Sequence, residues 1–167
     1  MCGVIGVVAN SPVNQLVYDA LLLLQHRGQD AAGMVTNQGQ RFFMHKNKGM
    51  VRDVFRTRNM RDLLGNMGIG HVRYPTAGNV DCLEEAQPFY VNAPYGLTLA
   101  HNGNLTNTDE IRDELFRLDK RHINTGSDSE VLLNVLAHEL SVAIADRDGL
   151  RAEHFFIAMR RVNARIR

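Results

Sequence analysis

The chain has 167 residues, of which 44% are hydrophobic and 22% are charged, a composition typical of a single folded globular domain. Its 19 basic and 18 acidic residues leave a formal net charge of +1, so the charge indicates neither nucleic acid nor a membrane surface as a partner. With only two cysteines, a disulfide framework is not indicated, and we expect a cytoplasmic protein with a small-molecule ligand.

The first elements in chain order are a strand, a helix and a hairpin. Residues 3–9 are apolar and rich in β-branched side chains, which predicts a buried first strand. Residues 13–25 carry apolar side chains at the helical period, and Gly28 is placed to end this helix in a left-handed conformation. Residues 32–36 and 41–45 flank a loop of Asn, Gln and Gly, which predicts a β-hairpin.

Helices dominate the later part of the chain. Residues 51–64 are weakly helical and residues 67–74 are strand-like, whereas residues 75–94 lack periodicity and predict a long surface loop. Residues 96–101 predict a strand that runs into a tight turn. Three amphipathic helices are predicted after this turn, at residues 109–118, 129–140 and 152–165.

Cys2 is the residue best placed for nucleophilic chemistry. Removal of Met1 would leave a thiol and a free α-amino group on one residue. An α-amino group with a pKa near ~8 can accept the thiol proton at neutral pH, and the thiolate is the attacking form. A cysteine also stands at position 2 by chance in many chains, so the prediction depends on the other motifs.

Five separated motifs provide this context. In chain order they are Cys2, HRGQD at 26–30, GHVRYPT at 70–76, HNGN at 101–104 and TGSDSE at 125–130. Together they resemble the glutamine domains of the amidophosphoribosyltransferase family, which are N-terminal-nucleophile, class II glutamine amidotransferases. The absence of any tryptophan, in particular directly after Arg73, favours this branch over the glucosamine-6-phosphate synthase type.

The resemblance implies roles for five residues around the reacting amide. Cys2 would attack the side-chain amide of glutamine, and Asn102 with the backbone N–H of Gly103 would form the oxyanion hole. Arg27 and Gly28 would position the terminus that carries the nucleophile. Read without the resemblance, Asn102 and Gly103 are also the residues of an ordinary turn.

Three further residues are implied to bind the substrate. Arg73 would hold the α-carboxylate of glutamine, Asp128 its α-ammonium group, and Thr76 would line the pocket. Asp128 is also suited to cap the helix that follows it. Gly126 stands where the family pattern leads us to expect threonine, and the two histidines beside strand ends, His71 and His101, are expected to be structural.

The fold that the resemblance implies is α+β, an αββα sandwich of the N-terminal-nucleophile hydrolase type that is incomplete at the C-terminus. Residues 1–167 would be the N-terminal portion of the glutaminase domain, with the phosphoribosyltransferase domain absent. The expected partners are glutamine, the missing phosphoribosyltransferase domain and further copies in a homo-oligomer, with no nucleic acid and no membrane. No cofactor or metal is expected in this chain, and Mg²⁺ is expected for the absent domain.

The predicted function is hydrolysis of glutamine to glutamate and ammonia, as the glutaminase half of an amidophosphoribosyltransferase in de novo purine synthesis. Two alternatives stay open at the level of sequence. One is a catalytically inactive fragment that acts as a binding or regulatory module for a synthase partner. The other is the glutaminase part of a different N-terminal-nucleophile amidotransferase, which would feed another acceptor.

Overall fold

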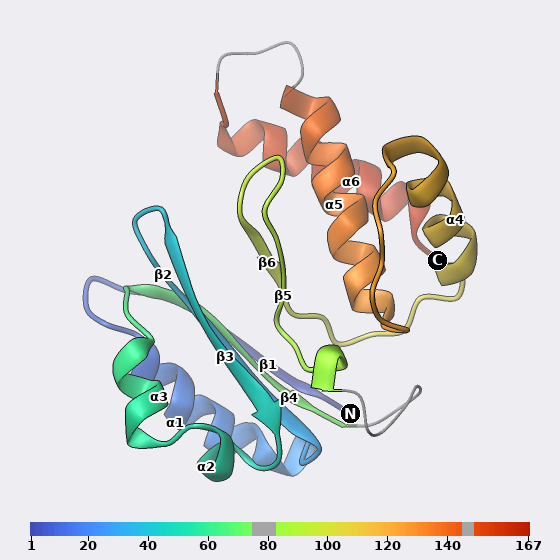
Figure 1. The fold of residues 1–167 in the computed structure, drawn as a ribbon. Helices are drawn as coiled ribbons and strands as arrows, with labels where there is room; N and C mark the ends of the chain where they lie inside the picture. Colours follow the sequence, from blue (N-terminus) through green and yellow to red (C-terminus); the bar gives the residue numbers. More distant parts are fainter. Residues whose placement is uncertain (75–82, 145–148) are drawn as a thin grey trace. The chain divides into compact units, whose positions relative to one another are not determined.

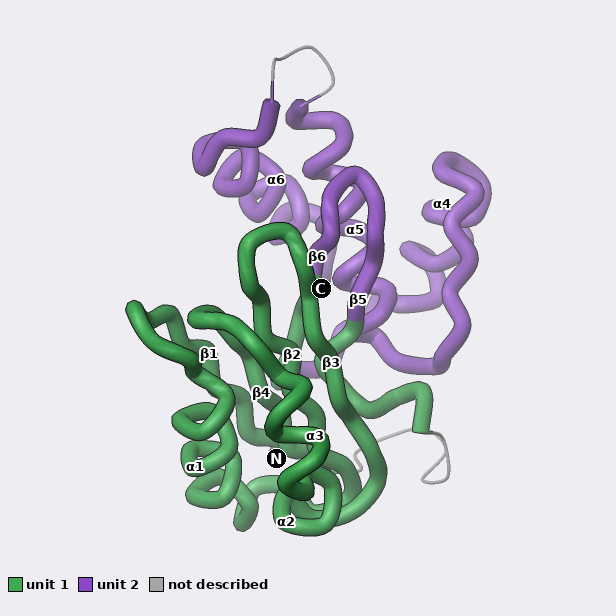
Figure 2. The backbone as a smooth tube through the Cα atoms, turned by 60° about the vertical axis from the view of Figure 1, so that its left-hand side comes forward, with its two compact units in different colours: residues 1–89, 98–102 green, residues 90–97, 103–167 purple. Residues whose placement is uncertain are grey.

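The computed structural model of the chain describes residues 1–74, 83–144 and 149–167 (Figure 1). These residues form two compact units (Figure 2): unit 1 holds residues 1–89 and 98–102, and unit 2 holds residues 90–97 and 103–167. Thr76, predicted to line the glutamine pocket, and Cys82 lie outside the described residues.

A four-stranded antiparallel sheet forms the centre of unit 1. Its strands are β1 (Gly3–Val8), β2 (Ala31–Gln38), β3 (Arg41–Lys48) and β4 (Met67–Arg73). They lie in the order β1-β4-β2-β3, so β4 is paired on both sides. Gly3 of β1 faces Val72, and Gly33 of β2 faces His71. The start of the chain therefore lies beside the end of β4, and the predicted hairpin of β2 and β3 is confirmed.

Three helices lie on one side of this sheet: α1 (Asn14–Leu24), α2 (Val51–Val54) and α3 (Thr57–Asp62) (Figure 1). The single weak helix predicted at 51–64 is wrong in this respect, because the buried Phe55, with φ −103° and ψ 85°, is not helical and separates α2 from α3. The core between helices and sheet is formed by Val13, Val17, Leu21, Ala32, Met34, Val51, Val54, Phe55, Leu63 and Val72.

The opposite face of the sheet is also covered. Because side chains alternate along a strand, Val72 points to the helices while His71 and Arg73 point away from them. These two side chains are nevertheless buried, with His71 only 1% exposed. The cover comes from residues 83–89, which begin with the short 3-10 helix η2 (Leu83–Glu85), and from residues 98–102.

Strand β1 differs from its prediction. It forms an edge of the sheet, and after the buried Gly3 its residues alternate between exposed and partly buried positions, with Val4 44% and Val8 78% exposed. The prediction of a buried first strand is therefore wrong, because an apolar β-branched run does not distinguish an edge strand from a central one.

Unit 2 consists mainly of the three predicted helices: α4 (Thr108–Asp119), α5 (Asp128–Ile144) and α6 (Ala152–Arg165). Helix α5 packs against both others, which explains why most of its apolar side chains are buried. The short strands β5 (Phe89–Val91) and β6 (Leu97–Leu99) pair with each other in a two-stranded sheet. Within the described residues, no helix has both the length and the apolar character that a membrane span requires.

The predicted loop at 75–94 is thus only partly a loop where it is described, since it includes η2 and β5. The mixture of helices and antiparallel sheets agrees with the predicted α+β class.

Candidate active site

Cys2 directly precedes β1, and other parts of unit 1 converge on it. Its backbone carbonyl accepts a hydrogen bond from Nε of Arg27 at 2.9 Å and another from Nδ2 of Asn102 at 3.0 Å. Its Sγ lies 3.3 Å from the backbone N–H of Tyr74, which donates to it. The pairing of β1 with β4 brings the thiol to Tyr74, because Tyr74 is the residue that follows β4.

Gly28 sits where two segments of backbone nearly touch. It has φ −164° and ψ 131°, an extended conformation, so the predicted left-handed helix end is wrong. A Cβ atom at this position would lie 2.6 Å from the carbonyl carbon and oxygen of Arg73. Glycine is required here because no other residue allows so close an approach of its backbone to the end of β4.

This approach also explains how Arg27 reaches the nucleophile. Helix α1 continues into the 3-10 helix η1 (Gln25–Arg27), and Nε2 of Gln25 donates to the carbonyl of Gly28 at 2.6 Å. The backbone N–H of Asp30 then donates to the carbonyl of Arg73 at 3.1 Å. The segment is therefore fixed against β4, and the Arg27 side chain is held beside Cys2.

Asn102 contacts both Cys2 and a buried histidine. Its Oδ1 lies 3.1 Å from Nε2 of His71. Burial lowers the pKa of the His71 imidazole to about 4, and this effect outweighs the opposing hydrogen bonds to Asn102 and to the backbone of His101. His71 is therefore neutral at pH 7, and its burial agrees with the expectation of a structural histidine.

The Arg73 guanidinium is paired with two carboxylates of the same unit. Its Nη1 donates to Oδ2 of Asp30 at 2.9 Å, and its Nη2 donates to Oε2 of Glu85. Sequence reasoning missed both acidic residues. Asp30 could have been found, because it ends the HRGQD motif and a buried arginine needs a counter-charge. The role of Arg73 in holding the carboxylate of glutamine stays a prediction.

Gly103 and Asp128 belong to unit 2, and their predicted roles beside Cys2 stay predictions. Asp128 is the first residue of α5. Its Oδ2 accepts a hydrogen bond from the backbone N–H of Leu105 at 3.0 Å, and its Oδ1 accepts one from the hydroxyl of Ser129 at 3.2 Å. Asp128 thus ties the start of α5 to the segment that follows the HNGN motif.

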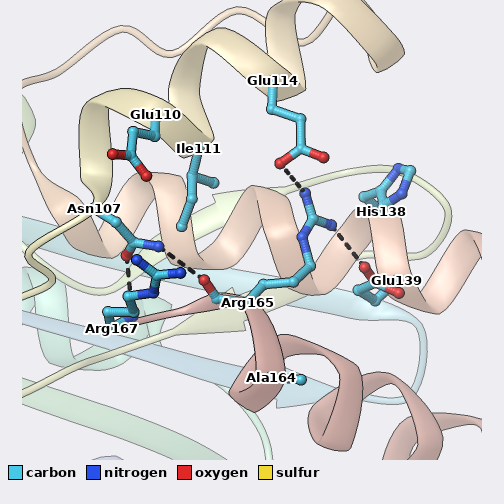
Figure 3. Close-up of a pocket in the computed structure, with 9 residues that line it drawn as sticks. All are labelled: Asn107, Glu110, Ile111, Glu114, His138, Glu139, Ala164, Arg165 and Arg167. Carbon is cyan, nitrogen blue, oxygen red and sulfur yellow. Dashed lines mark hydrogen bonds and ion pairs between the residues drawn. The ribbon is translucent and has the colours of Figure 1, made fainter.

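Unit 2 also contains a cavity of about 520 Å³, drawn in Figure 3. The guanidinium of Arg165 bridges Glu139 at 2.6 Å and Glu114 at 3.0 Å, and Asn107 bonds the backbone of both Arg165 and Arg167. Burial alone would lower the pKa of Arg165, but the two carboxylates raise it above its usual value. None of the predicted site residues lines this cavity, whose full lining is Asn107, Glu110, Ile111, Glu114, His138, Glu139, Ala164, Arg165 and Arg167.

Comparison with known proteins identifies similar sequences and structures. The family model described as "Glutamine amidotransferase domain" matches residues 71–158. Amidophosphoribosyltransferase of Pseudomonas aeruginosa is 62% identical over 142 residues, which are 85% of this chain and 28% of the relative. The enzyme of the same name from Escherichia coli is 56% identical over 168 residues, covering 100% of this chain and 33% of the relative.

Among solved structures, the glutamine phosphoribosylpyrophosphate amidotransferase from B. subtilis, complexed with ADP and GMP, matches with a TM-score of 0.78 and 29% identity. The match covers 100% of this chain and 33% of that one. The chain thus spans about a third of the length of the relatives it matches. This likeness confirms the predicted α+β fold of the N-terminal-nucleophile type.

Proposed function

Because the chain belongs to the glutamine amidotransferase domain family, we propose that it carries the glutaminase half of an amidophosphoribosyltransferase. In this proposal Cys2, made N-terminal by removal of Met1, hydrolyses the side-chain amide of glutamine. The products are glutamate and ammonia, and the ammonia serves purine synthesis. The proposal is supported by relatives that are 62% and 56% identical and carry that name.

The observation that carries the proposal is the contact between Asn102 and Cys2. The two residues are far apart in the chain, yet the Asn102 amide nitrogen lies 3.0 Å from the carbonyl oxygen of Cys2. A side-chain amide has two N–H donors, and this contact uses one of them. Within the described residues no second partner of this nitrogen is seen, so the other N–H can face an oxyanion formed next to the thiol, which is the role of a hydrogen-bond donor in an oxyanion hole.

The reaction needs only groups of the chain, glutamine and water. The Cys2 thiol gives its proton to the α-amino group, and the thiolate forms a bond to the amide carbon of glutamine. The resulting oxyanion faces Asn102 and the N–H of Gly103. The carbon–nitrogen bond then breaks, the departing nitrogen takes the proton and leaves as ammonia, and a thioester remains. Water attacks the thioester, restores the thiol and releases glutamate.

The substrate contacts and the partner domain are parts of the same proposal. Arg73 and Asp128 would bind the α-carboxylate and the α-ammonium group of glutamine, and Thr76 would line the pocket. Binding by Arg73 requires that the substrate carboxylate share or replace the contacts of Asp30 or Glu85, because both hold the guanidinium. Transfer of ammonia would require a phosphoribosyltransferase domain outside these 167 residues, with Mg²⁺ there.

The test is intact mass spectrometry of the purified chain before and after exposure to an electrophilic glutamine analogue. We expect loss of Met1 and a single adduct. Replacement Cys2→Ala should abolish the adduct, whereas Cys82→Ala should retain it, since Cys82 is the one other cysteine. Release of ammonia from glutamine, measured on the same samples, should follow the adduct.

Two outcomes would contradict the proposal. Retention of Met1 would leave no free amine on Cys2, and the proposed proton transfer could not occur. An adduct that persists in the Cys2→Ala variant would show that another group reacts. Either result, together with no ammonia release, would favour a binding or regulatory module over a glutaminase.

A further inference from the structure

We propose that His71 is a positioning residue for the reaction: it fixes the side-chain amide of Asn102 so that the N–H donors of that amide face Cys2. The inference rests on the proposed function, because the amide matters to catalysis only if Cys2 attacks a carbonyl group. It concerns a contact that is independent of substrate, so it can be tested separately.

The orientation of the Asn102 amide follows from its neighbours. The atom that faces Cys2 lies 3.0 Å from a backbone carbonyl oxygen, which can only accept a hydrogen bond. That atom must therefore be the nitrogen of the amide. The other amide atom, 3.1 Å from Nε2 of His71, must be the oxygen. Because this oxygen can only accept, Nε2 of His71 must carry the proton and donate it.

The protonation state of the ring agrees with this assignment. The assignment places the one ring proton on Nε2, the atom that lies 3.1 Å from Oδ1 of Asn102. Burial holds the pKa of the ring at about 4, and the ring is therefore a neutral donor throughout the neutral pH range.

The position of His71 in the fold makes it a rigid support. It lies on β4, the strand that is paired on both sides, where it faces Val4 of β1 and Gly33 of β2. Asn102 itself is exposed and lies outside the strands. An exposed amide can rotate between two orientations, and only one of them presents N–H groups to Cys2. A donor fixed in the sheet selects that orientation, because the other would place nitrogen against Nε2–H.

The first experiment compares two substitutions of His71 in the full 167-residue chain. Leucine removes the donor, whereas glutamine keeps a neutral N–H donor on a side chain of similar reach. Loss of one oxyanion-hole donor typically costs about 10²–10³ in rate. We expect His71→Leu to lower kcat by about 10- to 100-fold with little change in KM, and His71→Gln to recover most of the loss. The exposed His122→Leu serves as the matched control and should retain the parent rate.

A double-mutant cycle identifies the path of the effect. If His71 acts through Asn102, then His71→Leu should have little further effect in an Asn102→Ala background. Multiplicative losses would overturn the proposal, because they would mean that His71 supports activity independently of Asn102. The same conclusion would follow if KM rose while kcat stayed constant.

The second experiment needs no activity. Nitrogen-15 NMR of labelled histidine in the unsubstituted chain should show a neutral His71 ring with its proton on Nε2 at pH 7. The side-chain NH₂ signals of Asn102 should shift in His71→Leu and not in His122→Leu. A proton on Nδ1, or a ring that titrates near the ordinary histidine pKa, would overturn the inference. If the chain shows this NMR pattern but releases no ammonia, the proposed function fails while the contact stands.

Discussion

Replacement of Gly28 by alanine should damage both the stability and the reactivity of unit 1. The added Cβ would lie 2.6 Å from the carbonyl carbon and oxygen of Arg73 and 2.7 Å from the carbonyl oxygen of Val72. These are backbone atoms of a strand paired on both sides, so they cannot move away as a flexible side chain would. Gly28 already has an extended backbone, so alanine adds no backbone strain and the whole effect is steric.

The expected loss in free energy of unfolding is about 1–3 kcal/mol, the range for overpacking of a filled site. A urea titration followed by circular dichroism measures it. The displacement of Arg73 and Tyr74 should also slow the labelling of Cys2 by an electrophilic glutamine analogue, roughly tenfold or more. Gly6→Ala is the matched control, because its Cβ would meet only Ile69 at 3.8 Å, an ordinary contact. Equal stability of the two variants would refute the steric argument.

Three other measurements test the contacts around the site. Glu85→Gln should cost about 1–3 kcal/mol in the free energy of unfolding, because it leaves the buried Arg73 with one carboxylate. The exposed Asp109→Asn is the control and should have no measurable effect in the same urea titration. Arg27→Lys should slow Cys2 labelling about tenfold, because lysine keeps the charge but lacks the Nε–H that donates to the Cys2 carbonyl. Arg52→Lys is the control. Equal labelling rates in the two variants would exclude a role of Arg27 in positioning Cys2. Lowering the pH from 7 to 5 should reduce the free energy of unfolding by about 2 kcal/mol through His71. The pKa of His71 is about 4 in the folded chain and 6.5 in the unfolded chain, so the unfolded state binds more protons over this pH range. In urea titrations at both pH values this part of the loss should be absent from His71→Gln, and an unchanged loss would contradict the assignment.

Much of the fold could be predicted because its elements have local causes. The helix predicted at 152–165 matches α6 in both bounds, since His154, Ala158 and Val162 repeat at helical spacing and all three are buried. The hairpin of β2 and β3 follows from its loop, where Gly39 adopts φ 62°. The period of apolar residues and the chemistry of turns were sufficient for these elements.

The errors occurred where a distant segment determines the conformation. Gly28 stands where a helix-ending glycine is expected, but its conformation is set by the backbone at the end of β4. Likewise the β-branched run at residues 3–9 contains no information on which strands would pair with it, and β1 became an edge strand. In both cases the rule for the local pattern was sound, and tertiary contact overrode it.

Prediction of the site was limited in the same way, because tertiary contacts cannot be deduced from a local motif. The motifs identified Cys2, Arg27 and Asn102, and the structure brings these three residues together in unit 1. The motifs did not identify the buried contacts of Arg73 and Asn102. Glu85 lies outside every motif, and its role depends on the burial of Arg73, a property that no sequence pattern displays. His71 lies inside a motif, but its contact with Asn102 joins two motifs that only the fold makes neighbours.

Two side chains donate hydrogen bonds to the carbonyl group of Cys2, and the proposed place of Cys2 at the chain terminus explains why. In the proposed enzyme Cys2 is the first residue, so it lacks the preceding peptide bond that would hold an internal residue in place. Its α-amino group must remain free to accept a proton, and its thiol must remain free to attack. The carbonyl is then the one backbone group that the protein can hold without blocking the reaction. Arg27 and Asn102 both donate to it, and the strand that starts at Gly3 fixes the chain on its other side.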